Sequence, residues 1–349
     1  MRSLTVDRAH ADEAFVSQLR YEDVYTASST VLFAHPLPSS SHTLLTEAGP
    51  QDRSFLLSVP GDTSHSSRER WPKALADSLA DFDYYTHFPS RAMSTSVWPV
   101  RDPEKVLVCS SGGFENVFIG TVADENRLPR PEIKLSIGND ETTLWDSAIS
   151  FTGESAVIGG SDRIIHLSME GRILARLPGA AYSRSVSWLN AGTIAASSGK
   201  ELLLWDTRTR GSSSRFSCRS AITGVRTVPS SNANQLLLST NQNILLQDTR
   251  MLRSKPLLDF SILHEGPQLV FDVNHRDLVA FSHKEGRRNE VRILSLRTGQ
   301  LLKTLETREA VTKKRPTQLT WREDERGVEF LQACIGERIG RWCWNSDDT

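Results

Sequence analysis

The stretch SAISFTGESAVIGGSDRIIHLSMEGRILARL (147–177) decides the fold. Its apolar runs are short, and glycine or polar residues separate them, which is the pattern of β-strands joined by tight turns. We interpret it as four strands, SAISF, AVIGG, RIIHLS and RILARL, with a glycine turn, a polar turn at Ser161 and Asp162, and a turn at Gly171. The stretch therefore predicts a four-stranded sheet in chain order.

The same pattern recurs along the chain, and the last five repeats of its third strand lie roughly 40 to 48 residues apart. That interval is typical of a four-stranded propeller blade, whose sheet buries its faces on neighbouring sheets. We predict an all-β propeller of seven blades, with six or eight left open because 25–60 is Ser-rich and broken by prolines. The runs assigned to third strands are SFLLSV (54–59), NVFIGTV (116–122), RIIHLS (163–168), ELLLWD (201–206), NILLQD (243–248), VRILSL (291–296) and IGRWCW (339–344).

Two segments do not follow the blade pattern and are predicted to be helices. In the segment 6–25, Phe15 and Leu19 lie four residues apart, in register with Ala11. The segment WPKALADSLADFDYY (71–85) has a similar apolar stripe and a proline near its first turn. We therefore expect an N-terminal helical segment over 1–24 and one propeller domain over 25–349, with a helical insertion at about 66–90.

The composition excludes several classes of protein. With Lys+Arg 41 against Asp+Glu 42, the formal net charge of -1 lacks the positive excess of a general nucleic-acid binder. The four cysteines form no CxxC pair, so neither a disulfide framework nor a zinc site is expected. No stretch has the length and apolarity of a secretion signal or a membrane span. We expect an intracellular protein without a membrane anchor.

Several features resemble WD-repeat propellers over roughly 40–345. These are the pair Trp205-Asp206 at the end of a third strand, the stretch GGSDRIIHLS (159–168) and the repeat spacing. The chain departs from the family in having no Gly-His dipeptide. A second pair, Trp145-Asp146, is expected to lie before a first strand and not at the family's position.

The tripeptide Asp-Thr-Arg occurs twice, in LLLWDTR (202–208) and ILLQDTR (244–250). It resembles the WDxR signature of substrate receptors that dock on the damaged-DNA-binding adaptor of cullin-4 RING ubiquitin ligases. The stretches VRILSLRTGQLLKTL (291–305) and QLTW (318–321) are similar to the factor 4 branch of the cullin-4-associated factors. The resemblance implies that the adaptor is bound by the following residues: Asp206, Arg208, Asp248, Arg250, and Phe15 and Leu19 of the N-terminal helix.

The physical chemistry of the tripeptide permits that role and a simpler one. In an extended segment, residues i and i+2 share a face, so each Asp and Arg point the same way. The Asp can accept N–H groups of the following turn, and the planar Arg fork suits a protein interface. Both arginines could equally be solvated turn residues. We expect Gln247, which stands where the first copy has Trp205, to weaken the packing of its blade.

Two basic loops form a second candidate surface. The segment KEGRR (284–288) lies between the second and third strands of one blade, and KKRP (313–316) lies between that blade and the next. By propeller geometry both belong to the face opposite the Asp-Thr-Arg turns, although solvated loops would have the same composition. TKKRP also resembles a short nuclear import signal, so nucleus and cytoplasm are both expected. The predicted patch for a protein partner comprises Lys284, Arg287, Arg288, Lys313, Lys314 and Arg315.

Catalysis has no support in the sequence, because no HExxH, GxSxG or phosphate-loop spacing occurs. His166 lies inside a strand and is expected to pack in the core, and no cofactor or metal is expected. The leading hypothesis is a non-catalytic receptor that links a target protein to a cullin-4 ligase through its adaptor. It is expected to be monomeric within the larger complex. The alternative is a structural subunit of a stable assembly, such as a ribosome-biogenesis or nuclear-pore complex.

Overall fold

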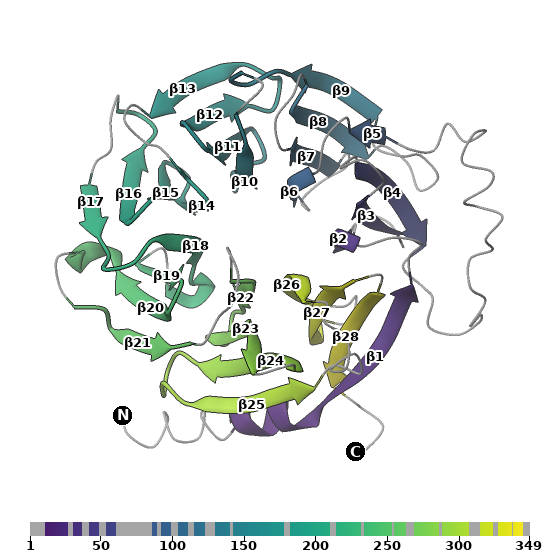
Figure 1. Cartoon of the computed structure of the whole chain (residues 1–349), viewed down its shortest axis with the longest axis vertical. Helices are drawn as coiled ribbons and strands as arrows, with labels where there is room; N and C mark the ends of the chain where they lie inside the picture. Colours follow the sequence, from purple (N-terminus) through teal and green to yellow (C-terminus); the bar gives the residue numbers. More distant parts are fainter. Residues whose placement is uncertain are drawn as a thin grey trace. The chain divides into compact units, whose positions relative to one another are not determined.

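In its described residues, the computed structural model has seven four-stranded sheets (Figure 1). Six are built from consecutive strands, and the seventh adds the first strand of the chain to the last three. The all-β prediction is confirmed. The chain divides into two compact units, one of residues 25–222 and one of residues 1–24 with 223–349, and each is described by itself. The structure describes residues 11–26, 31–36, 42–48, 54–60, 86–88, 92–98, 104–110, 115–122, 130–139, 142–177, 182–209, 214–231, 234–252, 255–262, 269–285, 288–306, 315–323, 327–336 and 338–344.

The unit of residues 25–222 contains four sheets in which neighbouring strands pair in chain order. The first two sheets are β2 (Val31–Pro36), β3 (His42–Ala48), β4 (Ser54–Pro60), β5 (Thr86–Phe88), and β6 (Ala92–Trp98), β7 (Glu104–Ser110), β8 (Val117–Val122), β9 (Arg130–Leu135). The next two are β10 (Leu144–Ile149), β11 (Ser155–Gly160), β12 (Ile164–Ser168), β13 (Ile173–Leu177), and β14 (Val186–Asn190), β15 (Thr193–Ser198), β16 (Glu201–Asp206), β17 (Ser214–Ser217).

The other unit contains three sheets and two short 3-10 helices, η2 (Pro229–Ser231) and η3 (Thr249–Met251). Two sheets are β18 (Ile222–Thr227), β19 (Gln235–Thr240), β20 (Asn243–Asp248), β21 (Leu258–Ser261), and β22 (Phe271–Val273), β23 (Leu278–Glu285), β24 (Arg288–Ser295), β25 (Leu301–Glu306). The last is β26 (Pro316–Glu323), β27 (Glu329–Ile335), β28 (Arg338–Trp344) and, from the other end of the chain, β1 (Leu19–Thr26), which pairs with β28.

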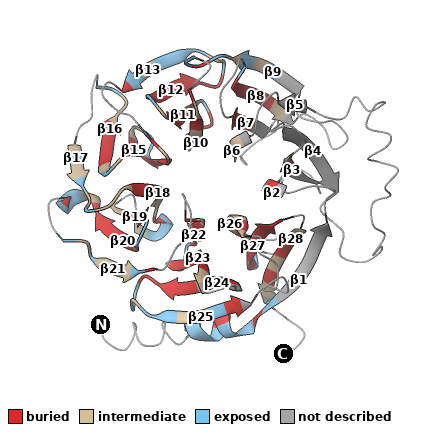
Figure 2. Cartoon of the chain, in the orientation of Figure 1, coloured by how far each residue is buried: buried red, intermediate tan, exposed pale blue. Residues whose placement is uncertain are grey.

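The core of each unit lies between neighbouring sheets. One buried cluster joins Val157 and Ile164 of one sheet to Trp188, Ile194 and Trp205 of the next. The second and third strands are buried almost throughout, as β11 and β12 show, whereas fourth strands such as β13 and β25 carry exposed residues (Figure 2). A sheet that buries both faces needs a neighbour on each side, which explains the repetition of the unit.

Most strand predictions are confirmed, and the N-terminal prediction is partly wrong. All seven runs assigned to third strands lie in third strands, from β4 to β28. The N-terminal helix ends at residue 18, because the chain from Leu19 onward pairs with β28 as strand β1. The helix predicted over 71–85 lies outside the described residues. Strand β5 falls within the range 66–90 that the sequence assigned to a helical insertion.

Each sheet has two ends that carry different connections. We call end A the end with the turns between the first and second strands and between the third and fourth strands. End B carries the turn between the second and third strands and the connection to the next sheet. Asp206 and Asp248 are the last residues of third strands, so both Asp-Thr-Arg segments lie at end A of their sheets.

Candidate functional site

The first Asp-Thr-Arg segment folds into a fork at end A of the β14–β17 sheet. Asp206 Oδ1 accepts hydrogen bonds from the backbone N–H of Arg208 at 3.0 Å and from its Nε at 2.9 Å. Asp206 Oδ2 accepts a third bond from Nη2 of Arg208 at 2.7 Å. The carboxylate thus binds the turn backbone, as the sequence predicts, and also one whole edge of the guanidinium.

The second segment has the same geometry at end A of the β18–β21 sheet. Asp248 Oδ1 accepts from the backbone N–H of Arg250 at 2.8 Å and from its Nε at 3.0 Å, and Oδ2 accepts from Nη2 at 2.7 Å. Asp248 is also the N-cap of η3. Because neighbouring residues differ between the two copies, the fork is a property of the Asp-x-Arg turn itself.

Each fork holds its guanidinium in solvent. The side chain of Arg208 is 82% exposed and that of Arg250 67%, whereas Asp248 is only 8% exposed. The Nε–Nη2 edge is occupied by the chain's own aspartate, which leaves the Nη1–Nη2 edge for a partner. An arginine held in this way loses less conformational freedom on binding than a free one, because its rotamer is already fixed.

The fork shifts the ionisation of its carboxyl group. Hydrogen bonds from the Arg208 side chain and backbone lower the pKa of Asp206 from 3.8 to about 2. The Arg250 side chain lowers the pKa of Asp248 in the same way. Since the folded pKa lies below the unfolded one, the contribution of the fork to stability is present above pH 3.8 and is lost as the pH falls through about 2.

We expect NMR titration of the Asp206 carboxyl group to give a pKa of about 2, and Arg208→Ala to return it close to 3.8, because the bidentate bond is then absent. Arg208→Lys should give an intermediate value, since an ammonium group cannot bind both oxygens in a plane. A wild-type Asp206 that titrates near 3.8 would mean that the fork does not persist in solution.

Gln247 takes over a polar contact of the tryptophan that it replaces. Trp205 Nε1 donates to the carbonyl of Thr209, four residues later, at 3.3 Å. Gln247 Nε2 donates to the carbonyl of Met251, also four residues later, at 3.2 Å. Both side chains are buried. The sequence predicts only lost packing at this position, whereas the structure shows that the turn-binding hydrogen bond is retained.

In both units, most exposed apolar side chains lie at end A of their own sheet, the end that carries the forks. Seven of the eight exposed large apolar residues among the described residues lie in or beside end A turns: Phe151, Ile173, Leu174, Met251, Leu257, Leu301 and Val328. Tyr182 is the eighth and lies at end B. Exposed apolar side chains and arginines are both typical of protein interfaces.

The N-terminal helix packs on its own unit. Phe15 and Leu19 are buried in a cluster with residues of β23, β24 and β26–β28, so the structure presents neither side chain to a partner. Lys303 Nζ donates to the carbonyls of Val16 at 3.0 Å and Ser17 at 2.9 Å, at the C-terminal end of the helix. Of the two alternatives left open by the sequence, packing is therefore the one that the structure shows.

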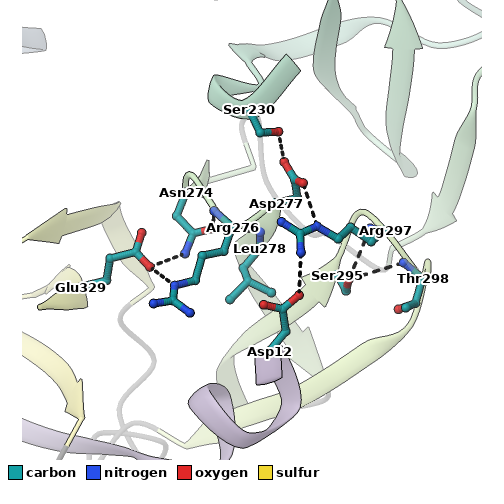
Figure 3. A network of polar contacts seen from close by, with 10 residues as sticks. All are labelled: Asp12, Ser230, Asn274, Arg276, Asp277, Leu278, Ser295, Arg297, Thr298 and Glu329. Carbon is teal, nitrogen blue, oxygen red and sulfur yellow. Dashed lines mark hydrogen bonds and ion pairs between the residues drawn. The ribbon is translucent and has the colours of Figure 1, made fainter. Parts of the chain in front are cut away.

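A polar network fixes the same helix at end A of the β22–β25 sheet (Figure 3). Arg297 forms ion pairs with Asp277 at 3.0 Å and with Asp12 of the helix at 3.6 Å. Arg276 forms one with Glu329 at 2.8 Å, and its guanidinium lies 4.8 Å from the centre of the Phe15 ring. The helix is thus contacted by one arginine from each end A turn of this sheet, Arg276 from the β22–β23 turn and Arg297 from the β24–β25 turn.

The predicted basic patch is only partly described. Lys284 lies in β23 and Arg315 directly before β26, both partly exposed, and Arg288 begins β24. The strand ends that flank the two basic loops, at the end of β23 and the end of β25, both belong to end B. Three residues of the patch lie outside the described residues, and these are Arg287, Lys313 and Lys314.

Two carboxylates to which the sequence analysis assigned no function join neighbouring sheets. Asp146 Oδ2 accepts from Ser185 Oγ at 2.8 Å and from the backbone N–H of Val186 at 3.1 Å. Asp272 Oδ2 accepts from the backbone N–H of Trp321 at 2.8 Å, and burial raises its pKa. Trp145 and Asp146 lie inside β10, and not before it as predicted, so this pair is a structural element of a first strand.

The described residues bear on metal binding and on cysteine reactivity. Among them, no group of three or more His, Cys, Asp or Glu side chains could hold a metal ion. Burial raises the pKa of Cys109 and Cys334 to about 12, so neither is a ready nucleophile. His166 packs edge-on to Trp188 and Trp205, with ring centroids 5.6 and 6.1 Å apart, and burial lowers its pKa. No helix in the described part of the chain has the length and apolarity to span a membrane.

Comparison with known proteins identifies the fold. No protein-family model and no curated protein sequence matches the chain. Among solved structures, the β-propeller domain of Cps50 (Swd1) from Myceliophteria thermophila is similar with a TM-score of 0.67 and 14% identity, over 93% of this chain and 100% of that one. The likeness shows that the chain has a β-propeller fold. Since 1154 solved chains match, the fold alone does not select a function.

Proposed function

We propose that this chain is a non-catalytic protein-interaction scaffold that binds a partner protein at end A of its sheets. The observation that carries the proposal is the repeated fork, in which an aspartate holds an exposed arginine in one orientation in two consecutive sheets. The exposed apolar residues at the same ends support it, since they give the partner area to bury beside the charged contacts.

In finer terms, we infer that the partner is the adaptor of a cullin-4 RING ubiquitin ligase and that the chain is a substrate receptor. This step rests on the likeness of the two Asp-Thr-Arg segments to the signature of such receptors. The retained hydrogen bond of Gln247 supports it, because the second fork keeps its geometry without the tryptophan. The receptor would accelerate ubiquitin transfer by holding a target near the ligase, without chemistry of its own.

The target would then bind elsewhere, and we place it at end B, where Lys284, Arg288 and Arg315 belong to the predicted basic patch. A basic surface favours an acidic region of a target protein, mainly through the rate of association. Neutralising Lys313, Lys314 and Arg315 should weaken target binding and leave adaptor binding unchanged. Loss of both together would contradict separate binding ends.

The test is capture of the purified adaptor by the wild-type chain and by the Arg208→Ala, Arg250→Ala double variant. Because two fixed, charge-assisted contacts are removed, we expect the dissociation constant to rise at least about tenfold. The control is Lys134→Ala, Arg176→Ala, which removes the same charge from exposed positions of the fourth strands β9 and β13. If both double variants lose the same adaptor affinity, the loss reflects net charge and not the two forks. If the wild-type chain captures no adaptor, the structural-subunit alternative is favoured.

A further inference from the structure

The end B connections of the β10–β13 and β14–β17 sheets are joined into one continuous rim by hydrogen bonds. The N–H of Tyr182 donates to the carbonyl of Ser161 at 2.9 Å, which ties the connection between the sheets to the β11–β12 turn. Two residues later, the N–H of Arg184 donates to Ser197 Oγ at 3.0 Å. The N–H of Cys218 donates to the carbonyl of Lys200 at 2.8 Å. The rim therefore presents its side chains from a fixed backbone.

Tyr182 occupies an unfavourable backbone conformation in this rim. Its φ angle is 55°, in the left-handed region that bulky L-residues rarely adopt, and its side chain is 65% exposed. An exposed ring contributes little burial to offset this strain. A strained residue whose side chain is directed to solvent is typical of a binding site, where the strain is kept because the side chain is needed there.

The charges around Tyr182 are predominantly positive. From the β11–β12 turn onward, the rim carries four basic residues against two acidic ones, and both acidic residues are ion-paired, Asp162 with Arg163 and Glu201 with Arg215 of β17. The Arg184 guanidinium lies 5.8 Å from the centre of the Trp145 ring. Residues 178–181 add no charge, and the acidic pair at 140–141 precedes the rim and lies outside the described residues. We define the rim patch as Arg163, Tyr182, Arg184, Lys200 and Arg219.

We propose that the rim patch binds an acidic peptide segment of another protein. Carboxylates of the segment would pair with Lys200 and Arg219, which are exposed, and an apolar side chain would lie on the Tyr182 ring. The patch belongs wholly to the unit of residues 25–222 and uses neither fork nor the basic patch of the other unit. The proposal therefore holds or fails independently of adaptor binding.

The first test measures fluorescence anisotropy of a fluorescein-labelled polyglutamate peptide with one central tryptophan, added to the full chain. We expect Lys200→Ala, Arg219→Ala to raise the dissociation constant about tenfold, and the wild-type affinity to fall as salt is raised. The control is Arg172→Ala, Arg176→Ala, which removes equal charge from exposed positions outside the rim and should change affinity less than twofold. Equal effects in the two doubles, or no binding by the wild type, would overturn the proposal.

The second test uses Tyr182→Gly, because glycine adopts a positive φ without strain. We expect the melting temperature to rise by about 2 °C and peptide affinity to fall about fivefold. A lower melting temperature would assign Tyr182 a structural role, and unchanged affinity would remove it from the site. If a single-stranded oligonucleotide binds the rim more tightly than the peptide, the rim serves nucleic acid and the proposal is overturned.

Discussion

Phe15→Ala should lower the free energy of unfolding by about 3 kcal/mol, measured by urea denaturation. The Phe15 ring is buried among strands at the opposite end of the chain, and its removal leaves a cavity. The substitution also removes the ring contact of Arg276, for which about 0.5–1 kcal/mol is typical. Phe15 thus connects the N-terminal helix to the sheet that β1 completes.

The matched control for Phe15→Ala is Ser17→Ala. Ser17 is an exposed residue of the same helix, and alanine favours helix formation. We expect its unfolding free energy to stay within about 0.5 kcal/mol of the wild type. If Phe15→Ala left stability unchanged and weakened capture of the adaptor, the helix would be a detachable anchor for the partner. That result would reinstate the insertion alternative.

Trp205→Ala should destabilise the protein more than Gln247→Ala does. We expect it to lower the free energy of unfolding, measured by urea denaturation, by about 4 kcal/mol. Trp205 is almost fully buried between two sheets, and its indole also binds the carbonyl of Thr209. Gln247→Ala removes a smaller side chain, whose Nε2 donates to the carbonyls of Asp248 and Met251, so we expect a loss of about 1–2 kcal/mol.

The two substitutions also test whether the fork depends on the residue before it. In each variant that remains folded, Arg208 and Arg250 should still bind the adaptor as in the wild type, because each fork closes on its own aspartate. A parallel loss of adaptor binding in Gln247→Ala would show instead that the buried side chain sets the position of Arg250.

The strands could be predicted from the sequence because their signal is local. Third strands such as RIIHLS (163–168) are buried on both faces, so they appear as unbroken apolar runs between polar turns. The point at which the N-terminal helix ends is set by pairing of β1 with β28, across almost the whole chain. No local pattern contains that information, and the helical stripe of Phe15 and Leu19 led the prediction past the true end of the helix.

In the candidate site too, local contacts could be predicted from the sequence and long-range contacts could not. The residues of each fork could be predicted from the sequence, because the Asp and Arg that form the ion pair are only two positions apart. The contacts of Asp146 with Val186 and of Asp272 with Trp321 join residues 40 and 49 positions apart, on the first strands of neighbouring sheets. Tyr182 is visible in the sequence as one aromatic in a polar loop, whereas its exposed, left-handed conformation is visible only in the structure.

Hydrogen–deuterium exchange of the chain with and without purified adaptor tests the central claim most directly. The account predicts slower exchange on binding at residues 207–209, after β16, and at η3, because both forks are covered. The end B turn at 198–200 should exchange at the same rate in both states. Protection confined to end B, with both forks unprotected in the bound state, would contradict docking through the forks.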